Sequence, residues 1–555
     1  MWDIDFSIYK RYNNGNSAAR RAAKPHGVHI VLDGGGVDIE GEAMLSRAYT
    51  AGISGIDGFE ITVECSAWDR IPKFELVGLP DAAVKEAKNR VVSACENSGI
   101  SFPAMDIMIN LAPADVRKEG TAFDLAIILA ILKSDGRLNS DVYLEDKCFI
   151  GELSLSGEVR AVNGILPMAI SAKNSGRREL FVPVGNAAEA SIVSGVTVYA
   201  VPTLISLIKH LSREERLTPV TAAPFDLSAR SACGDFSEVR GQLKAKRALE
   251  IAAAGGHNIL MIGPPGAGKS MLAKRLPSIL PDMSFEEAIE TTKIHSVAGT
   301  LTGNFITERP FRSPHHTVTM PGLAGGGTQP RPGEISLAHN GVLFLDELPE
   351  FTKRVTDSLR QPMEDDRVTV TRAAAKMTFP ALFMLVCAMN PCKCGFFGDP
   401  NKQCTCTSAA VAKYLDKISG PLLDRIDIEI ELPAVSYDDI SGKTAAGEPS
   451  AAIRERVNRA RAFANRRLIE AGEEPGVLNA KMSPRQLRRY CNPNKEGSEL
   501  MREAFESLGL SARGHDRVLR VARTIADLDG DAVINEDHIA EAIQYRSLDR
   551  KYWRR

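Results

Sequence analysis

The sequence has no apolar run long enough to cross a membrane. A transmembrane helix needs about 18 or more consecutive apolar residues, and the chain contains no such stretch. Its first residues also lack the apolar core of a secretory signal peptide. These absences exclude a membrane-spanning protein and predict one that works in the cytoplasm without a membrane partner.

The sequence also lacks an excess of charge of either sign. Its 68 Lys and Arg residues are balanced by 70 Asp and Glu residues, which gives a formal net charge of −2. This balance excludes a protein coated in positive charge. Any contact with nucleic acid must therefore depend on basic residues gathered locally, for example on loops that line a channel.

Cysteine is scarce for a chain of 555 residues. Four of the ten cysteines cluster between residues 392 and 406, and the others are scattered. A secreted protein that relies on disulfides has a denser framework in a shorter chain. The cysteine content therefore favours a reducing compartment.

The patterning changes at several points along the chain. Residues 1–43 are polar, and we expect either a disordered extension or a misassigned start, with translation beginning at Met44. Phe59 to Glu64 alternate with a period of two, which predicts a half-exposed strand, and residues 81–97 predict a helix. The sequence predicts an α/β chain with these parts: an α+β domain over residues 44–212, a linker over 213–235, an α/β domain over 236–435, a break at 436–449 and a charged helical domain over 450–550.

The strongest motif follows a buried-strand pattern at residues 258–262. The next eight residues fit G-x-x-x-x-G-K-[ST], and residues 271–280 suit a helix. Glycines let the backbone wrap around phosphates with its N–H groups pointing inward. A chance glycine-rich turn is the alternative, which the strand–loop–helix order disfavours. The predicted nucleotide-binding residues are Gly263, Pro264, Pro265, Gly266, Ala267, Gly268, Lys269, which would reach the β and γ phosphates, and Ser270, which would bind Mg²⁺.

Two carboxylates follow a second buried-strand pattern, over residues 341–345. Asp346 is placed to hold Mg²⁺ through water, and Glu347 is placed to polarise the attacking water. An apolar run that ends in Asp-Glu is common by itself. After a phosphate-binding loop in the same domain it is far more specific, and the two motifs together predict an enzyme that hydrolyses ATP.

Three more polar residues complete the predicted hydrolytic site. Asn390 ends an apolar run over residues 381–389, where it would orient the lytic water, although a strand-end Asn is more often a turn former. Arg425 would reach the γ-phosphate of a neighbouring subunit as an arginine finger, with a salt bridge to Asp424 or Asp427 as the alternative. In the helical segment we favour Arg517 over Arg513 as an arginine that senses nucleotide.

The order of these motifs resembles that of AAA+ ATPases. Three strings narrow the likeness: Arg312-Ser-Pro-His-His316, Gly325 to Asn340, and Ser511 to Asp527. They are similar to strings of the magnesium-chelatase-like group, and within it of the ComM/YifB family, and the likeness covers nearly the whole chain after residue 43. It implies an AAA+ P-loop core, a helical lid of the magnesium-chelatase C-terminal type, and homohexameric rings, assembled with ATP, that act as DNA helicases in branch migration during natural transformation and recombination.

The resemblance also implies two insertions in the AAA+ core that face a central pore. One lies around residues 311–327, and the other is a hairpin around residues 367–378. Positive loops in a pore would follow a phosphate backbone, which gives salt-sensitive binding that tolerates any sequence. Ordinary solvated charge is the alternative for each residue. The candidates for contact with DNA, junction or single-stranded, are Arg312, His315, His316, Arg367, Arg372 and Lys376.

The N-terminal domain resembles the Lon protease domain, which has a ribosomal protein S5-like fold. The likeness lies in residues 118–124 and 151–160. Lon proteases use a Ser–Lys dyad in which the lysine activates the serine. The matching positions here hold Ala122 and Leu166, which cannot perform that chemistry. The resemblance therefore implies a retained fold without proteolysis.

The clustered cysteines form the pattern C-x-C-x₉-C-x-C. Four thiolates at this spacing would bind a tetrahedral Zn²⁺ ion and staple the loop after Asn390. The spacing differs from the usual C-x₂-C knuckle, so free thiols and redox pairing stay as alternatives. Four protein thiolates leave no open position for a catalytic zinc. The predicted ligands of this structural zinc are Cys392, Cys394, Cys404 and Cys406.

Two other functions stay open. The ATPase subunit of a magnesium chelatase shares the core motifs, but a Lon-like domain fits the ComM group and not that subunit. A protein-remodelling AAA+ chaperone typically carries aromatic residues on its pore loops, whereas Phe311 is the one aromatic residue in the segment 311–327. The DNA motor is therefore the leading prediction.

Overall fold

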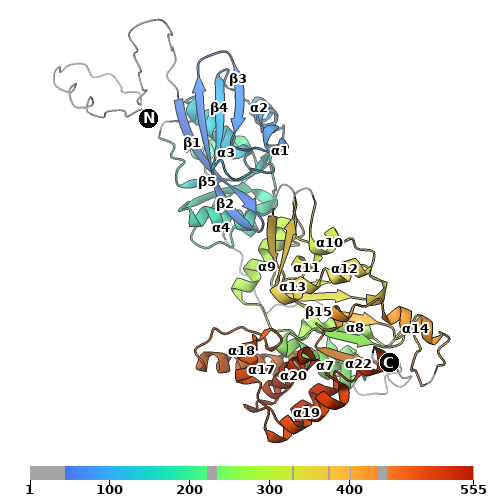
Figure 1. Cartoon of the computed structure of the whole chain (residues 1–555). Helices are drawn as coiled ribbons and strands as arrows, with labels where there is room; N and C mark the ends of the chain where they lie inside the picture. The colour runs from blue at the N-terminus through green and yellow to red at the C-terminus, as the bar shows by residue number, and fades with distance from the viewer. Residues whose placement is uncertain are drawn as a thin grey trace, which may run out of the picture.

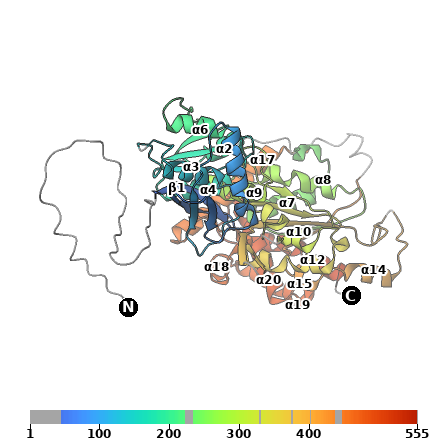
Figure 2. The same cartoon turned by 90° about the horizontal axis from the view of Figure 1, so that it is seen from above.

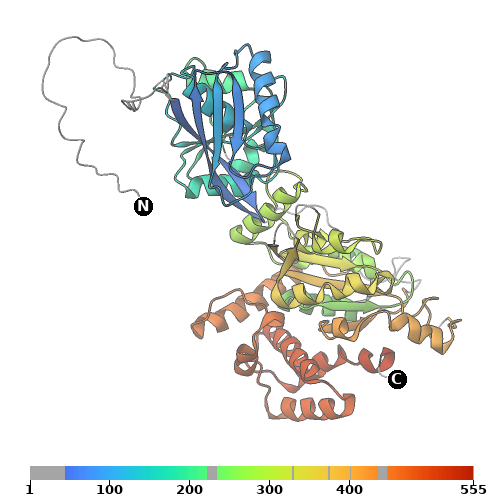
Figure 3. The same cartoon turned by 45° about the horizontal axis from the view of Figure 1, so that its top comes forward.

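A computed structural model describes residues 44–139, 141–221, 234–327, 330–372, 376–400, 402–435 and 447–553. The predicted extension at residues 1–43 lies outside these ranges, as do most residues of the two predicted breaks. An N-terminal domain, a central domain built on a parallel sheet and a helical C-terminal domain follow one another along the molecule (Figures 1 and 3). Within the described ranges, no helix is long and apolar enough to cross a membrane.

The N-terminal domain is built on a four-stranded sheet in the order β1-β2-β4-β3. Strand β2 alternates buried and part-exposed residues, as its period of two predicts, and so presents one face to the core. Helix α3 packs against β1 and β2, and it is buried nearly all round because almost all of its residues are apolar. These elements are β1 (Met44–Ser54), β2 (Asp57–Trp68), β3 (Lys73–Val77), α1 (Ala82–Lys85), α2 (Ala87–Asn97), β4 (Asp106–Ala112) and α3 (Asp124–Ser134).

The single helix predicted over residues 81–97 is wrong, because the structure has two helices, α1 and α2, with a break at Glu86. In a continuous helix the carbonyl of Ala83 would accept from the N–H four residues later. Here that carbonyl accepts a hydrogen bond of 3.1 Å from the guanidinium of Arg90. Arg90 also pairs with the buried carboxylate of Asp124 at 2.7 Å. The break therefore coincides with a tertiary ion pair that the local sequence pattern does not reveal.

A three-stranded parallel sheet, in the order β5-β8-β9, completes the N-terminal domain. Phe149, Phe181 and Tyr199 stack across its strands, with 5.0 Å between successive ring centroids. Strand β5 lies beside β1, which joins the two sheets. The remaining elements are β5 (Lys147–Phe149), β6 (Glu152–Leu153), β7 (Val159–Arg160), α4 (Ile165–Asn174), β8 (Glu179–Pro183), α5 (Ala187–Ala190), β9 (Thr197–Val201) and α6 (Leu204–Leu211).

The central domain carries a five-stranded sheet in the order β11-β12-β15-β10-β16, with all neighbouring strands parallel. Alternate residues of β10 enter the cores on its two sides, so a strand covered on both faces is apolar throughout. Its elements are α7 (Leu243–Gly255), β10 (Ile259–Ile262), α8 (Lys269–Arg275), α9 (Phe285–Ala298), β11 (Phe311–Arg312), α10 (Met320–Ala324), α11 (Glu334–Leu337), β12 (Gly341–Leu345), α12 (Lys353–Asp357), α13 (Arg360–Asp365), β13 (Arg367–Thr371), β14 (Lys376–Pro380), β15 (Phe383–Met389), α14 (Ser408–Leu415), α15 (Gly420–Leu423) and β16 (Ile428–Glu431).

The helix predicted over residues 271–280 starts earlier and is shorter in the structure. Helix α8 begins at Lys269 and ends at Arg275, and a 3-10 turn, η4 (Leu276–Ile279), follows it. Pro277 lies in this turn and has no N–H with which to continue the α-helix. The early start places Lys269 and Ser270 in the first turn, whose N–H groups have no partner within the helix.

The C-terminal domain is a set of helices whose core is continuous with one side of the central sheet. Buried ion pairs stabilise this domain. The carboxylate of Asp527, whose side chain is 1% exposed, pairs with both Arg467 and Arg523. In two perpendicular views, α14 lies at the side of the molecule away from the N-terminal domain (Figures 1 and 2). The C-terminal elements are α17 (Ser450–Glu470), α18 (Pro484–Tyr490), α19 (Lys495–Leu508), α20 (Ala512–Asp529), α21 (Glu536–Gln544) and α22 (Leu548–Tyr552).

Helix α9 joins the N-terminal domain to the central domain. One end of α9 packs against α4, where the N–H of Gly164 donates to the carbonyl of Ser296 at 3.1 Å. The hydroxyl of Ser296 donates to the carboxylate of Glu189, which also accepts from the N–H of Leu166 at 3.1 Å. Burial raises the pKa of Glu189. Ile56, in the turn between β1 and β2, is part of a core of the central domain.

Candidate functional site

The loop between β10 and α8 forms an open cradle at the carboxyl edge of the sheet. Gly266 and Gly268 have φ of +80° and +88°, which glycine adopts at little cost. No atom of another residue lies within 4 Å of where a Cβ would stand at either position. The loop therefore has the backbone conformation and the room that phosphate oxygens need.

The side chain of Lys269 lies inside this cradle and is hydrogen-bonded to it. Its Nζ donates to the loop carbonyls of Gly263 and Pro264 at 2.7 and 2.9 Å, and to Oδ1 of Asn390 at 3.0 Å. Burial lowers the pKa of Lys269 to about 8, although the nearby carboxylates of Asp346 and Glu347 favour its charged form. A buried ammonium held by neutral oxygens is suited to exchange these partners for the charged oxygens of a nucleotide.

The two carboxylates and Asn390 meet the cradle because their strands are neighbours. Strand β12 pairs with β15, and β15 pairs with β10, so all three carboxyl ends lie together. The hydroxyl of Ser270 donates to Asp346 Oδ2 at 2.6 Å, so the two side chains expected to hold a Mg²⁺ ion stand side by side. Glu347 is held at φ +52°, a backbone conformation of some strain for a residue with a side chain. The structure thus brings together five of the predicted groups: Lys269, Ser270, Asp346, Glu347 and Asn390.

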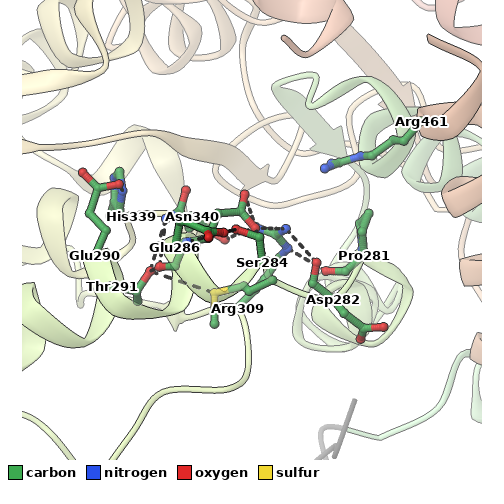
Figure 4. A network of polar contacts seen from close by, with 12 residues as sticks. Pro281, Asp282, Ser284, Glu286, Glu290, Thr291, Arg309, His339, Asn340 and Arg461 are labelled. Carbon is green, nitrogen blue, oxygen red and sulfur yellow. Dashed lines mark hydrogen bonds and ion pairs between the residues drawn. The ribbon is translucent and has the colours of Figure 1, made fainter. Parts of the chain in front are cut away.

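A polar network fixes the other end of strand β12, beside α9 (Figure 4). Arg309 donates to the carbonyls of Pro281 and Asn340 at 2.7 and 2.8 Å. The side-chain amide of Asn340 donates to the hydroxyl of Thr291 in α9 at 3.2 Å, and His339 pairs with the carboxylate of Glu290 in α9 at 3.2 Å. The strand that carries Asp346 and Glu347 is therefore tied to α9 at its amino end.

The predicted arginines lie at the opposite edge of the sheet from the cradle. Arg425 precedes β16, whose amino end lies beside that of β10, and β10 is four residues long, about 13 Å. Arg425, Arg513 and Arg517 line one cavity of about 340 Å³ between the central and C-terminal domains. All three arginines therefore lie at the edge of the sheet away from the phosphate cradle of their own chain.

The two candidate arginines of the C-terminal domain differ in exposure. The side chain of Arg517 is 8% exposed, lies 3.6 Å from the carboxylate of Asp427, and donates to the carbonyl of Ile426. Burial lowers its pKa. Arg513, one helical turn earlier on α20, is exposed. Arg517 therefore joins the two domains through contacts within the chain, whereas Arg513 is open to contact with another molecule.

Arg425 itself is held rather than free. Its guanidinium pairs with the carboxylate of Glu364 and donates to the carbonyl of Pro421 at 2.7 Å, with the side chain 13% exposed. Arg425 therefore does form a salt bridge inside the chain, but its partner is Glu364 and not Asp424 or Asp427, as the sequence suggested. An exposed acidic partner can yield its place to a phosphate, so the contact does not exclude a finger.

The four clustered cysteines converge on one point. Their ligand atoms all lie within 4.8 Å of one another, and three of the Sγ···Sγ distances are 3.3, 3.5 and 3.7 Å. Four thiolates around one Zn²⁺ at about 2.3 Å would stand about 3.8 Å apart. The cluster therefore fits a tetrahedral metal ion in both donor type and spacing.

The cysteine loop packs directly on the phosphate-binding loop, which the sequence did not reveal. At Gly395, with φ +86°, an added Cβ would stand 2.5 Å from Cδ of Pro265. On its other side, the ring of Phe397 meets that of Tyr552 in α22, with 6.4 Å between centroids. In the sequence, the one sign of such a contact is a glycine, Gly395, next to a cysteine. The loop lies between the phosphate site and the end of the chain.

The first insertion has all three of its candidate residues in contact with other groups of the chain, and His315 binds the hydroxyl of Thr317 at 2.9 Å. Arg312 makes two hydrogen bonds to the carboxylate of Glu334, at 2.7 and 2.8 Å. His316 lies with Nδ1 3.8 Å from Oε2 of Glu347, on the hydrolytic side of the site. His315 is exposed beside it. His315 is thus the most exposed of the three candidates, and Arg312 and His316 are about a third exposed.

The second insertion is the predicted hairpin, β13–β14, and its candidates are exposed. Along β13 buried and exposed residues alternate, with Arg367 on the exposed face, and Lys376 lies opposite Thr371 on the same ladder. Arg372 and Lys376 are exposed at its tip. The hairpin therefore offers one face of positive charges and hydroxyl groups, a suitable surface for phosphates.

The two positions expected to match a Lon-type dyad lie inside the N-terminal core. Ala122 is 5% exposed and Leu166 is fully buried. The N–H of Leu166 is taken by Glu189, which also binds α9. In place of a nucleophile and a base, these positions therefore contribute packing and the contact between domains.

Comparisons with known proteins agree with this arrangement. Three family models match: "Magnesium chelatase, subunit ChlI" over residues 235–440, "Subunit ChlI of Mg-chelatase" over residues 63–186, and "Magnesium chelatase, subunit ChlI C-terminal" over residues 447–546. Competence protein ComM of Haemophilus influenzae is 43% identical over 512 residues, which is 91% of this chain and 98% of that protein. Uncharacterized protein YifB of Escherichia coli is 42% identical over 508 residues, again 91% and 98% of the two chains.

A weaker likeness covers a quarter of the chain. Lon protease 2 of Bacillus subtilis is 25% identical over 146 residues, which is 25% of this chain and 26% of that protein. The stronger matches span nearly the whole of both relatives and carry the assignment, and the geometry of the phosphate site agrees with them. The chain is an AAA+ ATPase that belongs to the ComM/YifB family of magnesium-chelatase-like proteins.

Proposed function

We propose that this protein is a ring-forming motor of the cytoplasm that uses ATP hydrolysis to move on DNA. The observation that carries the proposal is the division of the hydrolytic groups between two edges of one sheet. Lys269 and Glu347 lie at the carboxyl edge, and Arg425 and Arg513 lie at the amino edge. A complete site therefore needs a neighbouring copy, and repeated contacts of this kind close into a ring, for which we propose six copies.

ATP fits the carboxyl edge. The open glycine cradle and Lys269 would bind its phosphates, and Asn390 would orient water for attack with Glu347 as the base. Mg²⁺ held by Ser270 and Asp346 would neutralise charge on the phosphates. Arg425, with Arg513 beside it, would stabilise the transition state in the next subunit.

DNA is the proposed track because of the β13–β14 hairpin. Its exposed face carries Arg367 and Lys376 together with hydroxyl groups of Thr369 and Thr378, which lie 3.0 Å apart. Such a surface binds phosphates and does not read bases, which suits a motor that must pass over any sequence. The name of the relative, competence protein, supports a role in natural transformation, and we propose branch migration as the activity.

The N-terminal domain is proposed to be Lon-like and inactive as a protease. The partial match to Lon protease 2 supports the fold, and buried Ala122 and Leu166 support the loss of activity. Its contacts with α9 make it a fixed part of the motor. We expect no cleavage of casein by the purified chain with ATP, and measurable cleavage would contradict this assignment.

We propose that the cysteine cluster holds a structural Zn²⁺ ion. The distances between its sulfur atoms are the evidence for this. The ion would fix the loop that packs against Pro265 of the phosphate cradle. Metal analysis of the purified chain should find about one zinc per subunit, and Cys404→Ser should lose it. Less than a tenth of an equivalent in freshly reduced wild-type protein would refute zinc.

The family models also support a second candidate, the ATPase subunit of a magnesium chelatase. ATP hydrolysis should be measured with single-stranded, duplex and four-way-junction DNA, and without DNA, at two salt concentrations, with Glu347→Gln as the inactive control. We expect stimulation by DNA that falls as salt rises, because phosphate contacts release counterions. Hydrolysis that DNA does not change would refute the DNA motor and favour the chelatase or a protein-remodelling role.

A further inference from the structure

A cavity of about 370 Å³ opens in the N-terminal domain, and its walls share no residue with the phosphate cradle. On one side it is lined by Lys147 and Glu179, which begin the neighbouring strands β5 and β8. The chain that follows α6 closes the other side. That chain is held in place, because the N–H of Val220 donates to the carbonyl of Val198 in β9 at 2.8 Å. A cavity of this size suits a small organic ligand.

Two aromatic side chains of the lining offer hydrogen-bond donors. The N–H of Leu217 donates to Nδ1 of His210 at 2.9 Å, so the ring carries its proton on Nε2. Burial lowers the pKa of His210, which keeps the ring neutral at pH 7. Its centroid lies 4.8 Å from that of Tyr199, and the ring of Tyr199 stacks on Phe181 at 5.0 Å, so both rings are fixed. Among the described residues, no group accepts from this Nε2–H or from the hydroxyl of Tyr199, which leaves both donors for a ligand.

Arg213 stands at a position where glycine is the usual residue. Helix α6 ends at Leu211 with Ser212 as its cap, and Arg213 follows with φ of +65°. The left-handed residue after a helix is usually glycine, because a residue with a Cβ is strained there. An arginine at such a position costs stability, which indicates that its guanidinium has a task.

The charges of the lining favour an anion. Lys147 pairs with the carboxylate of Glu179 at 2.9 Å, so these two charges offset each other. Arg213 and Arg216 are exposed, and within the described parts of the chain neither pairs with a carboxylate. The remaining charge of the lining is that of Asp141. Two positive groups therefore face one negative group, and both are arginines, which bind phosphates through two parallel hydrogen bonds.

We propose that this cavity binds a nucleoside phosphate, in addition to the ATP bound by the phosphate cradle. Arg213 and Arg216 bind the phosphate, and the donors of His210 and Tyr199 bind oxygens of the same ligand. The ring of Tyr143, which is 57% exposed and also lines the cavity, offers a face on which a base stacks. A free phosphate ion would leave most of the cavity empty and this ring unused.

The test disables the cradle and measures whether a nucleotide still binds. The full chain with Lys269→Glu, which places a negative charge in the cradle, is titrated with ADP by equilibrium dialysis. We expect about one ADP per chain. Adding Arg213→Gly or Arg216→Gln should raise the Kd about tenfold, which corresponds to the loss of one charge-assisted hydrogen bond. Adding Arg160→Gln, at an exposed arginine outside the cavity, should leave the Kd unchanged.

Arg213→Gly also separates binding from folding, since glycine relieves the backbone strain and its unfolding midpoint should not fall. A Lys269→Glu protein that binds no ADP would overturn the proposal. So would a Kd that Arg213→Gly and Arg216→Gln leave unchanged, because the ADP would then lie elsewhere. Inorganic phosphate that competes with ADP as strongly as AMP does would show that the cavity recognises phosphate alone and would refute a nucleoside ligand.

Discussion

The phosphate-binding lysine should make nucleotide affinity depend on pH in a range where most lysines do not titrate. Burial lowers the pKa of Lys269 from 10.5 to about 8, even though its Nζ donates hydrogen bonds to the oxygens of Gly263, Pro264 and Asn390. Bound phosphates need the ammonium form. Above pH 8, binding must therefore include the uptake of a proton.

The size of the effect follows from the fraction of Lys269 that is charged. With a pKa of about 8, roughly three quarters is charged at pH 7.5 and roughly a tenth at pH 9, so the Kd for ATP should rise about eightfold. Affinity for ATP must fall as pH rises, because the free protein loses the Lys269 proton that the complex keeps. A fluorescent ATP analogue titrated at both pH values measures the change, and Lys269→Arg, which stays charged, should show a flat profile.

Calorimetry gives a second measure that does not depend on the variant. At pH 8.5, binding in two buffers of different ionisation enthalpy should report uptake of about 0.8 proton per nucleotide. Uptake below about 0.2 proton, or the same rise in Kd for Lys269→Arg, would refute the assignment of the effect to Lys269.

Four further outcomes are expected. Glu347→Gln should lower kcat by about 10²- to 10⁴-fold while ATP still binds, as phosphate release and nucleotide titration would show. Arg425→Ala should also be inactive, yet mixing it with Glu347→Gln should restore hydrolysis, since one chain supplies Glu347 and the other the arginine; no recovery at any ratio would contradict a shared site. Lys376→Ala should reduce by about one the slope of log affinity for DNA against log salt, measured by fluorescence anisotropy. Leu129→Ala, at a fully buried position of α3, should destabilise the N-terminal domain by about 2–5 kcal/mol, and an unchanged unfolding midpoint would show that α3 is not central to that core.

The groups at the carboxyl edge of the sheet could be predicted because each belongs to a short, continuous motif in the sequence. A glycine-rich loop after a buried strand, or two carboxylates after another, needs no knowledge of distant residues. The order of the strands then brings Asp346 and Asn390 to the loop, since parallel neighbours end at one edge. Such local patterns predict the site reliably because the backbone of the loop itself forms the phosphate-binding surface.

The roles of single side chains could not be predicted in the same way. His316 and Arg312 look like free positive charges in the sequence, and only the fold shows Glu347 and Glu334 beside them. Arg513 and Arg517 lie one turn apart on the same side of α20, so only the packing at each turn decides which one is buried. Contacts between distant residues, rather than residue type, set these roles.

Helix α9 shows why domain boundaries alone leave the mechanism incomplete. Its sequence is an ordinary mixture of polar and apolar residues, yet Ser296 binds Glu189, 107 residues earlier, and Thr291 binds Asn340 at the start of the strand that ends in Asp346 and Glu347. One rigid helix therefore touches both the N-terminal domain and the strand of the catalytic carboxylates. If a partner shifts the N-terminal domain, α9 must either move β12 with it or break these hydrogen bonds. A cut between the domains would for the same reason leave buried polar groups of α9 without partners, so the two domains act as one unit.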